Sequence, residues 1–134
     1  MIRFQRITII RSRTPETENL NYELQWFGNS LGLFNLRDKD KSCFRIFIAL
    51  LKVAKNGEML SSDKLASRLN LSRGTVVFHL NKLMDSGIVI SKNNRYLLRV
   101  DNLKELIDEM EKDMQKACYS LREIAKDIDN KLEL

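Results

Sequence analysis

The chain is poor in the residue types that build catalytic, metal and disulfide sites. It has one histidine, His79, and two cysteines, Cys43 and Cys118, which are far apart in the sequence. Two isolated cysteines make neither a disulfide framework nor a metal cluster, and because both fall in apolar periodic stretches we expect buried thiols. There is no glycine-rich phosphate loop and no histidine–carboxylate pair beside a nucleophile, so we expect no enzyme, no metal and no other cofactor.

Long apolar runs are also missing. No stretch approaches the ~20 residues that span a bilayer, and residues 1–6 carry arginines among their apolar positions, unlike the core of a signal peptide. Hydrophobic residues still make up 43% of the 134 positions, enough for one small packed domain with an appendage. We expect a cytoplasmic protein without a membrane partner.

Acidic residues are scarce before position 101. The chain has a formal net charge of +5, and residues 101–134 hold ten acidic and six basic side chains, a balance of −4 that leaves +9 on residues 1–100. A basic part of this size suits a polyanion such as nucleic acid, while the acidic part is kept away from it.

Residues 61–87 have the pattern of two short helices separated by a tight turn. Serines precede both helices as caps, the second of them being Ser72. Asn70 stands at the turn, where a left-handed backbone suits asparagine, and Gly87 is a natural stop for the second helix. The pattern predicts a helix-turn-helix, in which the second helix reads DNA.

The neighbouring segments complete a winged plan. We predict a strand in residues 1–13, a short helix and turn in residues 18–34, a helix in residues 37–55, and a β-hairpin in which two apolar runs flank residues 91–95. Three helices followed by a hairpin make a winged helix-turn-helix with the hairpin as the wing. The expected fold class is therefore mainly α (α+β).

The final segment has an apolar repeat with alternating spacings of four and three. Its members are Leu103, Ile107, Met110, Met114, Ala117, Leu121, Ile124 and Ile128. Such a heptad predicts a long helix, capped by Asp101, whose stripe needs a partner. About thirty residues give a helix of ~45 Å, so we expect dimerisation with a second copy; the alternative is a helix folded back on its own domain.

These patterns divide the chain into three parts. Residues 1–36 form an N-terminal strand and short-helix segment, residues 37–100 a winged helix-turn-helix domain that binds double-stranded DNA, and residues 101–134 a coiled-coil-like dimerisation helix. The expected partners are DNA and a second copy of the chain. Whether a small-molecule effector binds is left open by the sequence.

The second helix of the motif supplies the candidate DNA-reading side chains. Val76, Leu80 and Leu83 share one face and are expected in the core. The helix start and the opposite face supply Ser72, Arg73, Gly74, Thr75, Val77, Phe78, Asn81 and Lys82. Arg73 has the donors to pair with guanine, and Asn81 the amide to pair with adenine.

Two residues of this helix have open roles. Phe78 is unusual because an exposed phenylalanine is costly, and we expect it to face DNA, the wing or a second subunit. His79 lies at the edge of the core face and is expected to be packed or bonded to the backbone.

Basic side chains in and beside the motif are expected to supply most of the affinity for DNA. The wing tip consists of Lys92, Asn93, Asn94 and Arg95. The basic side chains as a group are Lys64, Arg68, Arg73, Lys82, Lys92, Arg95 and Arg99.

Residues 71–89, LSRGTVVFHLNKLMDSGIV, resemble the winged-helix repressors of the ArsR type. That family reads Leu-Ser-x-x-Thr-Val-x-x-His-Leu-x-x-Leu and then Gly-Leu-Val. The matching residues are Leu71, Ser72, Thr75, Val76, His79, Leu80, Leu83, Gly87 and Val89, with Ile88 in place of the leucine. Residues 26–34 and 41–51 look like a group of small archaeal regulators of this superfamily.

The resemblance implies a homodimeric transcription factor on a partly palindromic operator, with the final helix serving dimerisation. Metal-sensing members carry paired cysteines at the start of the recognition helix, or histidine and aspartate clusters on the last helix. This chain has neither pattern, so metal sensing is not carried over.

Two other functions fit a winged helix. One is a protein-interaction module, in which Val77 and Phe78 form an apolar docking surface. The other is an architectural protein that binds phosphates with little base preference. The charges of Arg73, Lys82 and Arg95 around the apolar pair favour DNA, because an apolar docking site does not need them.

Overall fold

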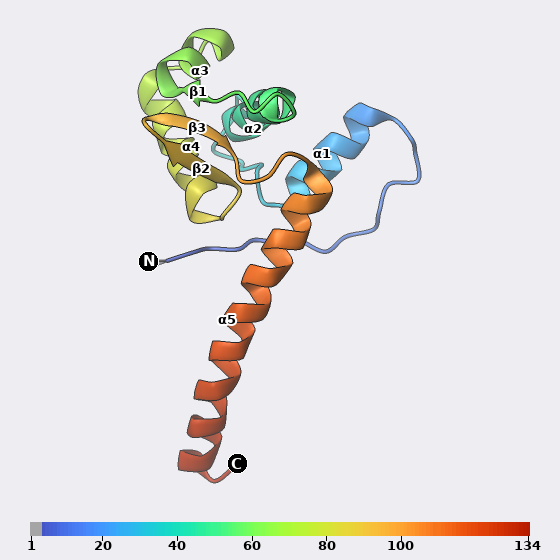
Figure 1. Cartoon of the computed structure of the whole chain (residues 1–134). Helices are drawn as coiled ribbons and strands as arrows, with labels where there is room; N and C mark the ends of the chain where they lie inside the picture. Colours follow the sequence, from blue (N-terminus) through green and yellow to red (C-terminus); the bar gives the residue numbers. More distant parts are fainter. Residues whose placement is uncertain (1–3) are drawn as a thin grey trace.

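Five helices and one small antiparallel sheet make up the computed structural model, which describes residues 4–134 (Figure 1). The elements are α1 (Leu20–Ser30), α2 (Ser42–Ala54), β1 (Leu60–Ser61), α3 (Ser62–Leu69), α4 (Arg73–Asp85), β2 (Val89–Lys92), β3 (Arg95–Leu98) and α5 (Leu103–Leu132). The strand order is β1-β3-β2. This is the expected winged helix-turn-helix, with a long C-terminal helix.

The core lies where α2, α3 and α4 meet the sheet. Its fully buried side chains include Phe47 from α2, Leu65 from α3, Leu80 from α4 and Ile88 before β2. The predicted inward face of α4 is confirmed, because Val76 and Leu83 are buried together with Leu80. This packing holds α4 by one side and leaves its other side open.

The turn between α3 and α4 has the predicted local chemistry. Asn70 adopts the left-handed conformation (φ 56°, ψ 49°). The hydroxyl of Ser72 accepts a hydrogen bond from the Thr75 amide at 3.1 Å and so caps α4. Gly87 follows the end of α4 with a φ of +82°. Each of these residues acts on its own neighbours in the chain, which is why the sequence identifies them.

The wing is a two-residue hairpin. Asn93 and Asn94 both have positive φ (51° and 61°), as the tight primed turn requires, and Lys92 faces Arg95 across the strands. The sequence did not predict β1, whose two residues pair with β3. A strand of two residues has no periodicity to read.

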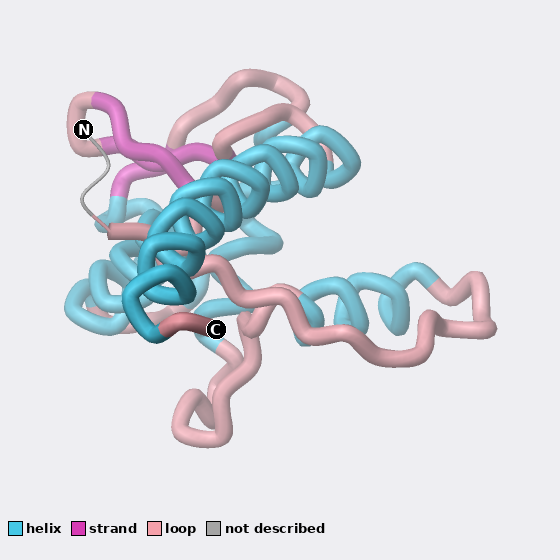
Figure 2. Tube along the Cα trace, turned by 90° about the horizontal axis from the view of Figure 1, so that it is seen from below, coloured by secondary structure: helices cyan, strands magenta, loops and turns pink. Residues whose placement is uncertain are grey.

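The N-terminal segment corrects the prediction of a strand in residues 1–13. Residues 1–3 lie outside the described part, and residues 4–13 form no strand; Figure 2 draws the segment as loop. The amide of Arg6 donates to the carbonyl of Asp85 at 2.9 Å, and the amide of Ile10 to that of Ser30 at 2.7 Å. These amides therefore bond to carbonyls at the ends of α4 and α1, and not to a strand edge.

Two helix starts also differ from the prediction. The helix expected from residue 37 begins at Ser42, because the carboxylate of Asp38 accepts hydrogen bonds from the amides of Ser42 and Cys43 (2.9 and 3.0 Å) and fixes the start there. The cap of α5 is Asn102 and not Asp101: its side chain accepts from the Glu105 amide at 2.9 Å.

Only the beginning of α5 packs on the domain. Leu106 and Met110 are buried, whereas the apolar side chains from Met114 onward are exposed, and Figure 1 shows the helix extending away from the other elements. The alternative of a helix folded back on its own domain is therefore wrong. Cys43 is buried as expected, but Cys118 is only half-buried because it lies on the projecting part.

Candidate nucleic-acid interface

The first half of α4 presents an open surface on the side away from the core. The exposed residues of the predicted reading set are Ser72, Arg73, Gly74, Phe78, Asn81 and Lys82. Thr75 and Val77 are half-buried and lie at the margins of this surface. A Cβ added at Gly74 would meet no atom within 4 Å, so the backbone there is open to a close approach by a ligand.

Ser72 and Thr75 are engaged with each other. The Ser72 hydroxyl donates to the Thr75 hydroxyl at 2.8 Å, in addition to its capping bond from the Thr75 amide. Their first role is therefore to start α4, whose first turn has amides without a partner inside the helix. Those amides carry partial positive charge at the helix N-terminus, which favours an anion.

Arg73 is held loosely in front of α4. Its Nε lies 3.4 Å from Oδ1 of Asp63 on α3, and both side chains are more than 70% exposed. An exposed pair of this kind contributes ~0–1 kcal/mol. The guanidinium is therefore free to leave Asp63 for a stronger, bidentate acceptor.

Phe78 is 60% exposed in the middle of this surface. The Lys82 ammonium lies 5.8 Å from the centre of its ring, one helical turn further on. Such a cation over an aromatic face is weakly attractive. The surface at Phe78 thus combines an apolar ring with positive charge.

The wing tip adds a second exposed basic surface. Lys92, Asn93, Asn94 and Arg95 are all exposed. Within residues 4–134, neither Lys92 nor Arg95 has a carboxylate within ion-pair distance. Both charges are available to an external partner.

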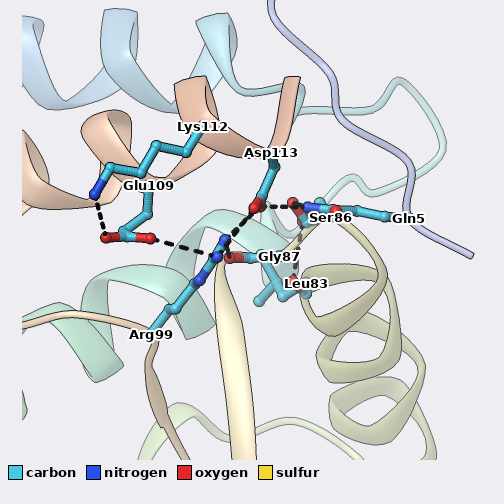
Figure 3. A network of polar contacts seen from close by, with 8 residues as sticks. All are labelled: Gln5, Leu83, Ser86, Gly87, Arg99, Glu109, Lys112 and Asp113. Carbon is cyan, nitrogen blue, oxygen red and sulfur yellow. Dashed lines mark hydrogen bonds and ion pairs between the residues drawn. The ribbon is translucent and has the colours of Figure 1, made fainter. Parts of the chain in front are cut away.

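Arg99, which was grouped with the basic residues of the motif, has a different role. It donates to the Asp113 carboxylate of α5 at 2.5 and 3.1 Å and lies 3.6 Å from Glu109, as Figure 3 shows. The hydrogen bond to Asp113 raises the pKa of Arg99. The expectation that Arg99 adds to a DNA-facing charge is wrong, because two carboxylates neutralise it.

Gln5 joins the same network from the N-terminal segment. Its amide donates to Asp113 at 2.8 Å and to the Ser86 carbonyl at 3.4 Å (Figure 3). A Cβ on Gly87 would overlap Nε2 at the flexible end of the Gln5 side chain, which can move aside, so it is the positive φ of +82° that favours glycine there. Sequence reasoning missed this cluster because its members lie up to 108 positions apart and carry no local pattern.

His79 is packed, as predicted, between α4 and the residues before α2. Its Nε2 lies 3.8 Å from Oδ2 of Asp38, and its buried Nδ1 has no hydrogen-bond partner within residues 4–134. Burial lowers the pKa of His79, and Lys82 adds to this, while Asp38 acts in the opposite direction. The shift favours the neutral imidazole, so the contact with Asp38 has little ion-pair character.

Burial affects the other titratable groups near α4 in different ways. It raises the pKa of the Cys43 thiol to about 11. Burial would also raise the pKa of Asp38, but the amides of Cys43 and Ser42 outweigh it and the net shift is downward. Across residues 4–134 no three potential metal ligands gather, and no helix is both long and apolar enough to cross a membrane.

The comparisons with known proteins agree with this geometry. Residues 48–91 match the family model described as bacterial regulatory protein, arsR family. The match spans the second half of α2, all of β1, α3 and α4, and the start of the wing. No curated protein and no solved structure matches the chain significantly. Residues 48–91 therefore form a helix-turn-helix domain of the ArsR type, and this domain supports a role as a DNA-binding transcriptional regulator.

Proposed function

We propose that this chain represses transcription as a homodimer that binds a partly palindromic operator with sequence specificity. The observation that carries the proposal is the open face of α4, with its capped N-terminus, beside an exposed basic wing tip. A dimer that occupies a promoter blocks transcription by excluding the transcription machinery from that DNA. Repression of this kind requires no surface besides the DNA interface and the dimer interface.

In this arrangement the start of α4 enters the major groove. Arg73 donates to guanine O6 and N7, and Asn81 pairs with the edge of adenine. Val77 and Phe78 offer apolar contact to thymine methyl groups. Gly74 allows the backbone to approach a phosphate, and Thr75 supports the helix start through Ser72.

The wing lies against the neighbouring minor groove. Lys92 and Arg95 are at the end of a tight hairpin whose turn residues, Asn93 and Asn94, are held in a defined conformation. A basic side chain at a narrow minor groove reads its enhanced negative potential. The wing thereby contributes affinity and sensitivity to DNA shape.

The dimer forms through the projecting part of α5. Leu121, Ile124 and Ile128 are 68%, 61% and 47% exposed. They continue the repeat that begins with Leu103, Ile107 and Met110 and runs through Met114 and Ala117. Exposed apolar side chains at heptad spacing are stabilised by knobs-into-holes packing with a second helix, and the same helix of another copy has the matching pattern.

The test is binding to a pool of random duplexes across a salt series, followed by selection and sequencing of the bound DNA. A recovered inverted repeat supports the regulator. Steep salt dependence without a consensus supports the architectural alternative, in which only phosphates are bound. No binding at low salt overturns both and leaves the protein-interaction module.

A further inference from the structure

A groove runs along α4 on the side of the loop that precedes α2. Arg37, Lys39 and Asp40 line it from this loop, which we call the basic loop (residues 35–41). Gly74, Phe78 and Lys82 line it from α4. The groove has a volume of about 640 Å³, and its α4 wall belongs to the surface that is proposed to meet DNA.

The basic loop has a defined shape. The side chain of Asn35 accepts a hydrogen bond from the Arg37 amide at 2.8 Å, and the Lys41 amide donates to the Asp38 carbonyl at 3.1 Å. The Asp38 side chain is tied to the start of α2, and Lys41 closes the loop in the left-handed conformation (φ 53°). The loop therefore presents its basic side chains in a fixed place beside α4.

Most of the charged side chains that line the groove are positive and, in the described part of the chain, form no ion pair. Asp38 is occupied by the amides of α2. Within residues 4–134, no carboxylate lies within ion-pair distance of Arg37, Lys39 or Lys82. Asp40 is the one exposed acidic side chain on the loop wall. Three unpaired cations against one free carboxylate favour an anionic occupant.

We propose that the basic loop is a third DNA-contacting element, which binds the sugar–phosphate backbone that borders the major groove entered by α4. This inference rests on the proposed function. When Gly74, Phe78 and Lys82 face the major groove, the adjoining DNA strand lies in the groove between α4 and the loop. Arg37 and Lys39 then contact phosphates, and the sugars cover the exposed ring of Phe78.

The test compares the salt dependence of DNA binding in matched variants. Each phosphate contact contributes about 0.9 to the slope of log K against log salt. Arg37→Ala/Lys39→Ala is expected to reduce the slope by about 1–2 and the affinity at least several-fold. The selected sequence is expected to stay the same, because phosphate contacts carry no base information.

Two further variants sharpen the result. Lys116→Ala/Arg122→Ala removes the same number of positive charges from exposed positions on the projecting part of α5 and is expected to leave the slope unchanged. Asp40→Asn removes the opposing carboxylate and is expected to increase affinity severalfold, which a merely structural loop would not do. Circular dichroism checks that each variant folds.

The outcomes separate the two proposals. If the wild-type protein binds DNA and the basic-loop pair behaves like the α5 pair, the loop is not a DNA contact, although the regulator stands. A changed consensus in the basic-loop variant also contradicts phosphate binding. If the wild-type protein binds no duplex, the proposed function fails and this inference fails with it.

Discussion

Arg99 donates two hydrogen bonds to Asp113, and this contact joins the end of the wing to α5. The distances are 2.5 and 3.1 Å, and the Asp113 side chain is only 8% exposed. Gln5 bonds to the same carboxylate and to the end of α4 (Figure 3). This polar cluster, together with the buried Leu106 and Met110, therefore orients α5 relative to the recognition helix, and the proposed dimer would set the spacing of its two α4 helices through it.

Arg99→Ala is expected to destabilise the fold by about 2 kcal/mol, because it leaves the largely buried carboxylate of Asp113 without its charged partner. The matched control is Lys104→Ala. Lys104 forms an exposed ion pair with Asp108 on α5, the helix that also carries Asp113. This control variant is expected to leave stability unchanged within error. Urea unfolding at fixed protein concentration measures the stability of both variants. Equal midpoints for the two variants would show that the Arg99–Asp113 contact stabilises the fold no more than the exposed Lys104–Asp108 pair does.

Stability is expected to fall as the pH drops below about 6.5. His79 has a pKa lowered from its usual 6.5 by burial. The unfolded chain therefore takes up a proton at a pH at which the folded chain does not, and proton uptake favours unfolding. Thermal unfolding from pH 8 to pH 5 measures this effect. His79→Gln is expected to flatten the pH dependence over this interval, and an unchanged slope in that variant would assign the effect to other groups.

A second loss of stability is expected in stronger acid. The hydrogen bond from Arg99 lowers the pKa of Asp113 below its usual 3.8, against the opposing effect of burial. The stabilisation is therefore complete above pH 3.8 and is lost as the pH falls through the lowered value. Asp113→Asn removes this titration, so the acid limb of its stability profile should be shallower than that of the wild type. A profile parallel to the wild type would contradict the assignment.

Arg73→Ala is expected to relax base preference at one position of each half-site, at a cost of about 1–3 kcal/mol for the preferred base. Lys92→Ala is expected to weaken all sequences about equally if, as we propose, Lys92 binds the phosphate backbone, because phosphate contacts carry no base information. Competition binding with single-base variants of the selected duplex distinguishes the two patterns. Uniform losses for Arg73→Ala would remove it from the reading set.

Leu121→Glu is expected to convert the proposed dimer to a monomer at micromolar concentration, because it places charge in the apolar stripe of α5. Tyr119→Glu is the matched control: Tyr119 is 64% exposed against 68% for Leu121, but it lies outside the stripe. Sedimentation equilibrium measures both masses. A wild-type monomer, or the same mass for both variants, would rule out this dimer.

The predictions that the structure confirms rest on residues that act on their neighbours in the chain. Asn70 fixes the turn of the motif, Ser72 caps α4, and the Asn93–Asn94 pair closes the wing. Each has a backbone preference that is visible without knowledge of the fold. The heptad of α5 is equally local, because its period alone predicts a long helix.

The features that the sequence did not predict depend on distant contacts. The N-terminal segment has an alternating pattern, yet it runs as a loop because the ends of α1 and α4 take its amides. The role of Arg99 depends on Asp113, and that of Asp38 on the start of α2 and on His79. In the basic loop, the sequence alone does not distinguish Arg37 and Lys39 from ordinary surface charges. Their role depends on α4, which lines the same groove.

Native mass spectrometry of the protein on its selected duplex tests the central claim most directly, with one half-site scrambled in a parallel sample. Two chains are expected on the intact site, with α4 and the wing of each on one half-site. Scrambling one half is expected to reduce affinity sharply at the same salt concentration. A single chain per duplex, or full affinity for the scrambled site, would contradict a dimeric regulator that reads an inverted repeat.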